Sequence, residues 1–122
     1  AARAVYSESR IGKIPHEYKR RYFMRGRNDK SELVRIVPEL RAATEFFSMN
    51  LMNSCYPFSD KFDIIFCRNA LIYFDKSNQE KIIKRLTGHL SKNGFLFIGH
   101  SETLSAYDLP LKCLEPTIFR RA

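Results

Sequence analysis

The sequence predicts an α/β fold built on a strand–helix–strand unit, from two apolar runs and a helix signal between them. The runs cover residues 62–67 and 94–99, and each stops on a polar cluster. A short apolar run is typical of a strand that is buried on both faces, as in a parallel sheet covered by helices. Ligands of such sheets bind outside the carboxyl ends of the strands, so we expect a functional site at both polar clusters.

Composition sets the limits of the fold. The chain has 122 residues, of which 44% are hydrophobic, enough for one small domain or for part of a larger one. Its apolar runs are far shorter than the ~20 residues that a membrane helix needs, so we expect no membrane insertion. Three widely spaced cysteines match no metal-ligand spacing. We therefore expect reduced thiols, a cytoplasmic protein and no metal site.

The net charge is +8, from 21 basic and 13 acidic residues. Such a field attracts nucleic acid, acidic lipid headgroups or an acidic protein surface, and the alternative is a solvated face without a partner. Aromatic residues near the charges would suit stacking on bases. We expect no nucleic acid, because the four-residue spacing of Tyr18 and Tyr22 is explained more simply by a helix face that packs on the core. The charge concentrates in the first third of the chain, at Arg3, Arg10, Lys13, Lys19, Arg20, Arg21, Arg25, Arg27, Lys30 and Arg35.

The first third also predicts short elements. Residues 1–9 are expected to be the end of a helix, and Pro15 suits the first position of a second helix over residues 15–22. A polar turn then separates two strand-like segments, 22–24 and 33–37, which predicts a β-hairpin.

The helix between the two apolar runs begins at a capping signal. Residues 77–80 match a capping box, with Asp75 as a rival cap. Residues 92–94 are expected to end this helix, because they supply a basic side chain, an Asn and a Gly. Segments 111–113 and 117–121 predict a final antiparallel hairpin. The apolar residues that recur on one face of the helix are Ile82, Ile83, Leu86 and Leu90.

Polar side chains follow the first apolar run at once. Arg68 and Asn69 place a guanidinium and an amide at the end of a strand, where burial without partners is costly, so we expect partners for both. Those partners are either a ligand or a network that holds neighbouring loops. Tyr73 stands four residues on in an apolar stretch, where a phenol is more often a core residue than a catalytic one.

Two further clusters are candidates. Asn50 and Leu51 follow residues 46–49, which we expect to be a strand. An amide there suits a base edge or a ribose hydroxyl and a leucine suits a ring face, while the alternative is a turn, in which Asn is common. Residues 100–102 (His-Ser-Glu) are no hydrolase triad, because adjacent side chains do not converge on one bond and no G-x-S-x-G elbow is present. Gly99 before them allows close backbone approach.

These motifs together resemble the CheR-type chemoreceptor glutamate methyltransferases. The phrase F-C-R-N-x-x-I-Y-F-D at residues 66–75, followed by G-H-S-E at residues 99–102, is highly specific. Shorter segments fit the same family in order, at Val5-Tyr6-Ser7, Tyr22-Phe23 and Met49-Asn50-Leu51. The resemblance covers essentially the whole chain and only the later part of the family's catalytic domain.

The resemblance implies a partial Rossmann-like fold of a methyltransferase that uses S-adenosylmethionine and releases S-adenosylhomocysteine. It implies methyl transfer to glutamate side chains on the cytoplasmic helices of chemotaxis receptors. Because such receptor regions carry glutamates, it also implies an acidic protein partner for the basic first third of the chain. Residues 1–122 would be the C-terminal part of the methyltransferase domain, with a small antiparallel β-subdomain inserted at 22–43.

Site residues carry over from the resemblance by position. Asn50 and Leu51 would meet the adenine of the cofactor, and Arg68 and Asn69 would line its pocket near the methionine end. Tyr73 would stand close to the transferred methyl as the catalytic residue. The family's glycine-rich loop and ribose-binding acid would lie upstream of these 122 residues. We therefore expect a fragment that is inactive alone, and the alternative is a non-enzymatic binding module that retains the fold.

Overall fold

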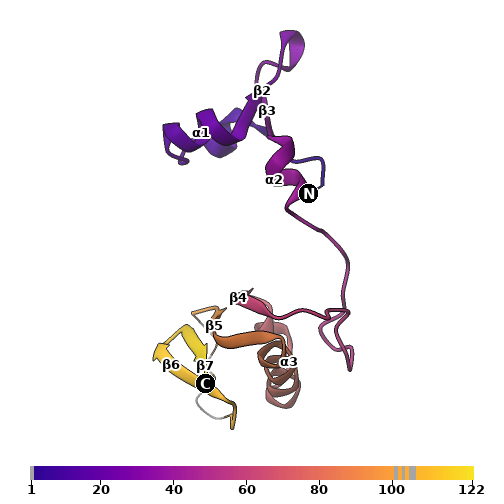
Figure 1. Ribbon diagram of the computed structural model, residues 1–122, viewed down its shortest axis with the longest axis vertical. Coiled ribbons are helices and arrows are strands. Elements are labelled where there is room, and N and C mark those ends of the chain that lie inside the picture. The colour runs from indigo at the N-terminus through magenta and orange to yellow at the C-terminus, as the bar shows by residue number, and fades with distance from the viewer. Residues whose placement is uncertain (1, 101, 103, 105–106) are drawn as a thin grey trace. The chain divides into compact units, whose positions relative to one another are not determined.

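The computed structural model describes residues 2–100, 102, 104 and 107–122 (Figure 1). The chain divides into two compact units, Ala1–Ser48 and Met49–Ala122. Each unit holds its own sheet, and each is described by itself.

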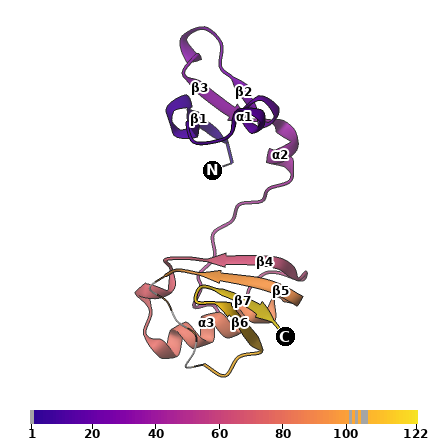
Figure 2. The same cartoon turned by 90° about the vertical axis from the view of Figure 1, so that its left-hand side faces the viewer.

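The first unit contains a three-stranded antiparallel sheet in the order β1-β3-β2 (Figure 2). β3 (Leu33–Ile36) pairs with both β1 (Val5–Ser7) and β2 (Phe23–Arg25). The pairing of β2 with β3 confirms the first predicted hairpin. The connecting elements are η1 (Glu8–Ile11), α1 (His16–Tyr22), η2 (Asn28–Lys30) and α2 (Pro38–Ala42).

Two expectations for the first unit are wrong. The expected helical end over residues 1–9 is instead β1 followed by η1, because backbone pairing with the distant β3 stabilises the extended chain. The helix predicted at 15–22 is present as α1, but α1 buries no residue in a core. Tyr18 and Tyr22 stack on one another, with ring centroids 6.1 Å apart, and Tyr18 is 49% exposed. Their spacing therefore reflects a pair on the surface of α1 and not a face that packs on the core.

The predicted β-subdomain at 22–43 contains β2, β3 and α2, while the sheet also includes β1 from upstream of that range. Its status as an insertion stays a prediction. The strand expected at 46–49 is absent, since this segment belongs to neither sheet and the side chain of Phe46 is exposed. Aromatic content alone suggested a strand there, and the segment has no regular secondary structure.

The second unit contains a four-stranded mixed sheet in the order β4-β5-β7-β6. β4 (Phe62–Cys67) and β5 (Leu90–Ile98) run parallel, and β7 (Ile118–Arg121) pairs antiparallel with β5. β6 (Leu111–Glu115) completes the sheet and pairs with β7, which confirms the final hairpin. With α3 (Lys76–Gly88) between β4 and β5, the predicted strand–helix–strand unit is confirmed.

The core of this unit lies between α3 and one face of the sheet. Ile82 and Ile83 of α3 are fully buried, as is Leu96 of β5. β4 is not buried on both faces, contrary to the prediction: Ile65 and Cys67 face the core, whereas Ile64 is 51% and Phe66 68% exposed. Within the described part of the chain β4 is an edge strand. The Phe66 ring stacks on the ring of Phe97 of β5, with centroids 4.7 Å apart.

α3 starts and ends at positions that correct the expected ones. Asp75 is the N-cap, and its carboxylate accepts a hydrogen bond of 2.8 Å from the backbone N–H of Asn78, so the rival cap is confirmed over Ser77. The helix ends at Gly88 and not at 92–94. Leu90 already belongs to β5, because its backbone pairs with Phe62 across the parallel ladder.

We expect Asp75→Ala to lower the free energy of unfolding by about 1 kcal/mol in the natural protein that contains this chain, since a side-chain cap on α3 is lost. Urea unfolding measures the change. Ser77→Ala is the matched control and is expected to stay within about 0.5 kcal/mol of the parent. A larger loss for Ser77→Ala than for Asp75→Ala would return the capping role to Ser77.

Candidate functional site

The two polar clusters meet because their strands end side by side. Cys67 of β4 pairs with Ile98 of β5, so Arg68 and Gly99 start the following loops at the same edge of the sheet. A Cβ added to Gly99 would lie 2.9 Å from Oδ1 of Asn69. The loops are thus in direct contact, and a side chain at position 99 would force them apart.

Arg68 and Asn69 are both exposed. Arg68 makes no hydrogen bond or ion pair with the residues that the structure describes, so the alternative of a network that holds neighbouring loops finds no support there. The alternative of a ligand as its partner stays a prediction. Asn69 has a φ of 57°, in the left-handed region that Asn tolerates better than most residues. At that turn the chain leaves β4, and Asn69 stays close to Gly99.

Tyr73 ends the short helix η3 (Leu71–Tyr73). Leu71 is fully buried in the core, whereas the Tyr73 side chain is 82% exposed. Tyr73 therefore lies outside the core of this unit, contrary to the alternative reading of its apolar neighbours. A buried leucine anchors the turn, and the phenol two residues on faces outward.

Asn50 and Leu51 lie in a turn and not at the end of a strand. Asn50 Oδ1 accepts a hydrogen bond of 2.9 Å from the backbone N–H of Met52, the pattern of an Asx turn. The Leu51 carbonyl accepts hydrogen bonds from the Tyr56 hydroxyl at 2.8 Å and from Arg85 Nη1 at 3.4 Å. Burial raises the pKa of Tyr56 against the opposing effect of Arg85, so its hydroxyl stays a donor at neutral pH.

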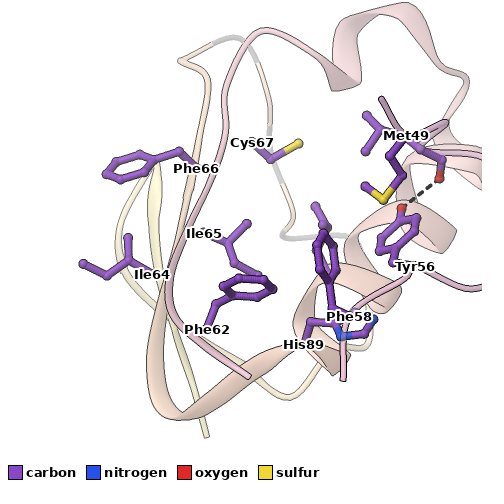
Figure 3. A pocket seen from close by; sticks show the side chains of 11 residues that line it. Met49, Tyr56, Phe58, Phe62, Ile64, Ile65, Phe66, Cys67 and His89 are labelled. Atoms are coloured by element: carbon purple, nitrogen blue, oxygen red, sulfur yellow. Dashed lines mark hydrogen bonds between the residues drawn. The ribbon is translucent and has the colours of Figure 1, made fainter. Parts of the chain in front are cut away.

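An apolar pocket of about 300 Å³ lies along the open edge of β4 (Figure 3). It brings Leu51 to the same cavity as Phe66 and Cys67, the last residues before Arg68. His89 was not among the candidate residues that the sequence indicated. The His89 ring lines this pocket and stacks on Tyr56, with ring centroids 5.9 Å apart. The aromatic residues at 56, 58 and 62 were the signal for this cluster.

The three cysteines are free thiols, and only Cys67 is buried. Burial and then the charge of Glu102 raise the pKa of the Cys67 thiol to about 11. The thiol is therefore protonated at neutral pH. Within the described ranges, no cluster of three or more His, Cys, Asp or Glu suits a metal ion, and no helix is long and apolar enough to cross a membrane.

Parallel strands with polar clusters at their carboxyl ends define a class of α/β proteins that bind a nucleotide-like cofactor at that edge. The chain belongs to the CheR methyltransferase family, because the sequence profile of the family's SAM-binding domain matches residues 1–119. This match confirms the resemblance and the Rossmann-like fold class.

Three similar proteins illustrate the relationship. A chemotaxis protein methyltransferase of Salmonella typhimurium is 43% identical over 105 residues, which are 86% of this chain and 36% of the relative. Chemotaxis protein methyltransferase 2 of Pseudomonas aeruginosa is 38% identical over 84% of this chain and 36% of its own length. The chemotaxis protein methyltransferase of Escherichia coli is 38% identical over 86% and 37%. The chain thus spans little more than a third of these relatives.

Proposed function

We propose that the natural protein containing this chain transfers a methyl group from S-adenosylmethionine to glutamate side chains of chemoreceptors. The relatives, named chemotaxis protein methyltransferases, support this proposal. The observation that carries it is the edge where β4 and β5 end, where Arg68, Asn69 and Tyr73 are exposed on loops with anchored backbones. The cytoplasmic location belongs to the same proposal, since the receptor segments concerned are cytoplasmic.

The residues present fit such a cofactor. Arg68 has a solvated guanidinium without an ion-pair partner in the described ranges, which suits the carboxylate of an amino-acid moiety. Leu51 lines an apolar cavity, which suits one face of an adenine ring. When bound, S-adenosylmethionine supplies a methyl group on a positively charged sulfur.

The chain itself has little chemistry to supply. A glutamate carboxylate is ionised at pH 7, so no general base is needed to activate it. In this proposal the Tyr73 hydroxyl orients that carboxylate by a hydrogen bond. The exposed phenol and the backbone anchored through buried Leu71 support this role. Alignment of the two reactants and exclusion of water then account for the rate.

The direct test is transfer of labelled methyl from S-adenosylmethionine to a receptor cytoplasmic fragment by the natural protein. We expect label in base-labile esters on glutamates of the fragment, and none on a fragment with those glutamates replaced by alanine. Capture of the fragment with no transfer would favour the alternative of a non-enzymatic binding module.

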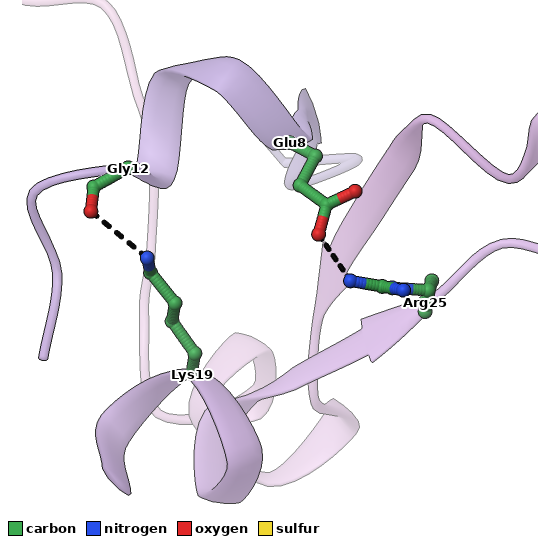
Figure 4. A network of polar contacts seen from close by, with 4 residues as sticks. All are labelled: Glu8, Gly12, Lys19 and Arg25. Atoms are coloured by element: carbon green, nitrogen blue, oxygen red, sulfur yellow. Dashed lines mark hydrogen bonds and ion pairs between the residues drawn. The ribbon is translucent and has the colours of Figure 1, made fainter. Parts of the chain in front are cut away.

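We also propose that the basic first unit meets the acidic protein partner. Some of its cations are already engaged: Arg25 pairs with Glu8, and Lys19 donates to the Gly12 carbonyl at 2.9 Å (Figure 4). Arg20 and Arg21 on α1 are exposed, and the Arg21 guanidinium lies over the Tyr22 ring, 5.3 Å from its centroid. Neither arginine forms an ion pair within the described residues, so both charges can attract acidic side chains. Complementary charge of this kind raises the association rate more than the affinity.

The charge reversal Arg20→Glu, combined with Arg21→Glu, is therefore expected to slow association with the receptor fragment about tenfold at low salt, and less at high salt because ions screen the attraction. Surface plasmon resonance measures the rate. The control is Lys84→Glu, at an exposed position of α3 in the other unit. This substitution is expected to change the association rate little. Tight binding of mixed oligonucleotides with no capture of the fragment would overturn this assignment.

A further inference from the structure

A buried carboxylate joins the two loops that carry the proposed site. Glu102 is only 7% exposed, in a unit whose other charged side chains are largely at the surface. Its Oε1 accepts a hydrogen bond of 2.8 Å from the backbone N–H of Leu71, and its Oε2 accepts one from the backbone N–H of Gly99. One side chain thus links the loop after β4 to the loop after β5.

The space around Gly99 shows how tight this link is. A Cβ at position 99 would lie 2.7 Å from Oε2 of Glu102 and 3.1 Å from the backbone nitrogen of Asn69. Both contacts are closer than real Cβ atoms tolerate without a shift of their neighbours. The carboxylate of Glu102 and the loop at Asn69 therefore leave no room for a side chain at position 99.

The turn that carries Tyr73 is also held from its other side. Gln79 of α3 donates from Nε2 to the carbonyls of Leu71, at 3.0 Å, and Phe74, at 2.9 Å. The Tyr107 hydroxyl donates to Gln79 Oε1 at 3.1 Å. Glu102 binds the N–H of Leu71 and Gln79 binds its C=O, so the backbone of η3 is fixed at both groups while the phenol of Tyr73 stays outward.

We propose that Glu102 is a positioning residue, which sets the loop from Arg68 to Tyr73 against the end of β5 and so aligns the site for methyl transfer. The proposal rests on the proposed function. Glu102 has both oxygens engaged by backbone N–H groups, so it acts through the loop and not on the reactants. A displacement of about 1 Å at a reacting group is enough to cost about 100-fold in rate.

The test compares Glu102→Gln with the parent in the natural protein. The amide nitrogen of Gln is a donor and would face a backbone N–H, which is also a donor. One of the two hydrogen bonds that join the loops is therefore lost, and the close approach of two donors is unfavourable. We expect kcat for methyl transfer to fall about 10- to 100-fold, with a smaller change in KM. Without any cofactor, we expect hydrogen exchange at the amides of Leu71 and Gly99 to speed up at least tenfold.

Ile83→Val is the matched control, because it removes one methyl group from the core of the same unit and none of the hydrogen bonds that Glu102 makes to the loops. Both variants are assayed below their unfolding midpoints. Ile83→Val is expected to leave kcat and both amides unchanged. Glu102→Asp is the second variant: it keeps a carboxylate that is too short to reach both amides, and an intermediate kcat is expected.

Each outcome separates the two proposals. Full kcat in Glu102→Gln with faster exchange at Leu71 and Gly99, or an equal loss of kcat in Ile83→Val, overturns the positioning role. Unchanged exchange at both amides overturns the link itself. A parent protein with no transfer activity refutes the proposed function, and the exchange measurement still decides whether Glu102 holds the loops.

Discussion

Tyr73→Phe in the natural protein is expected to lower kcat for methyl transfer about 10- to 100-fold and to leave the affinity for S-adenosylmethionine unchanged. The phenol is 82% exposed, so its hydroxyl is not part of the packing of this unit. In our proposal the Tyr73 hydroxyl binds the reacting carboxylate. Loss of a contact that is made in the transition state lowers kcat. Stopped assays under saturating cofactor and substrate give kcat, and calorimetry gives the affinity.

The control for Tyr73→Phe is the same substitution at a tyrosine whose hydroxyl has no proposed role. Tyr18→Phe removes a half-exposed phenol from the first unit and is expected to leave kcat unchanged. An unfolding midpoint within about 1 °C of the parent is expected for both variants. Equal kcat for the parent and Tyr73→Phe would remove Tyr73 from the site.

Arg68→Ala is expected to weaken binding of S-adenosylmethionine about 10- to 100-fold. A hydrogen bond to a charged group contributes about 1.5–3 kcal/mol, and about 1.4 kcal/mol corresponds to a tenfold change in Kd. The free energy of unfolding is expected to stay the same, since Arg68 is exposed and makes no ion pair within the part of the chain that the structure describes. Calorimetry and urea unfolding on one preparation measure both quantities.

Arg20→Ala is the matched control for Arg68, because it removes an exposed arginine of the other unit and is expected to leave Kd unchanged. Arg68→Lys keeps the charge but not the planar fork, so part of the affinity should return. A loss of stability with an unchanged Kd would instead make Arg68 a structural residue.

Local signals in the sequence were sufficient for the order of strands and helix in the second unit, but not for the end of α3 or the burial of β4. The apolar period of α3 and the two apolar runs predicted β4, the helix and β5, because neighbours within a few residues decide these elements. Local signals failed where pairing with a distant strand determines the secondary structure. Residues 5–7 are a strand because β3, almost 30 residues on, pairs with them, and no local pattern reports that.

The burial of β4 was predicted wrongly for a related reason. An apolar run shows that a strand suits a buried position, but it does not show which neighbours cover it. Phe66 and Ile64 are exposed because β4 is an edge strand among the described residues and α3 covers only the other face. Composition alone does not separate these two cases.

In the candidate site, too, local patterns indicated some residues, while others depend on contacts between distant segments. The position of Arg68 and Asn69 at the carboxyl end of β4 was predictable, since polar residues that follow an apolar strand mark this end. Their role toward the cofactor stays a prediction. The role of Glu102 was not predictable, because its partners Leu71 and Gly99 are set by how two loops 31 residues apart meet. For Asn50 the alternative of a turn is confirmed, because its side chain accepts a hydrogen bond from the backbone N–H of Met52 in an Asx turn. A role of Asn50 in the cofactor site stays a prediction.

The most direct test of the central claim is a crystal structure of the natural protein with S-adenosylhomocysteine. The proposed function places the product at the edge where β4 and β5 end, with Arg68 and Asn69 at its amino-acid end and Leu51 against its adenine. Tyr73 is then expected to lie beside the sulfur that carried the methyl group. Product bound elsewhere, with none of these residues in contact, would contradict the assignment of the site.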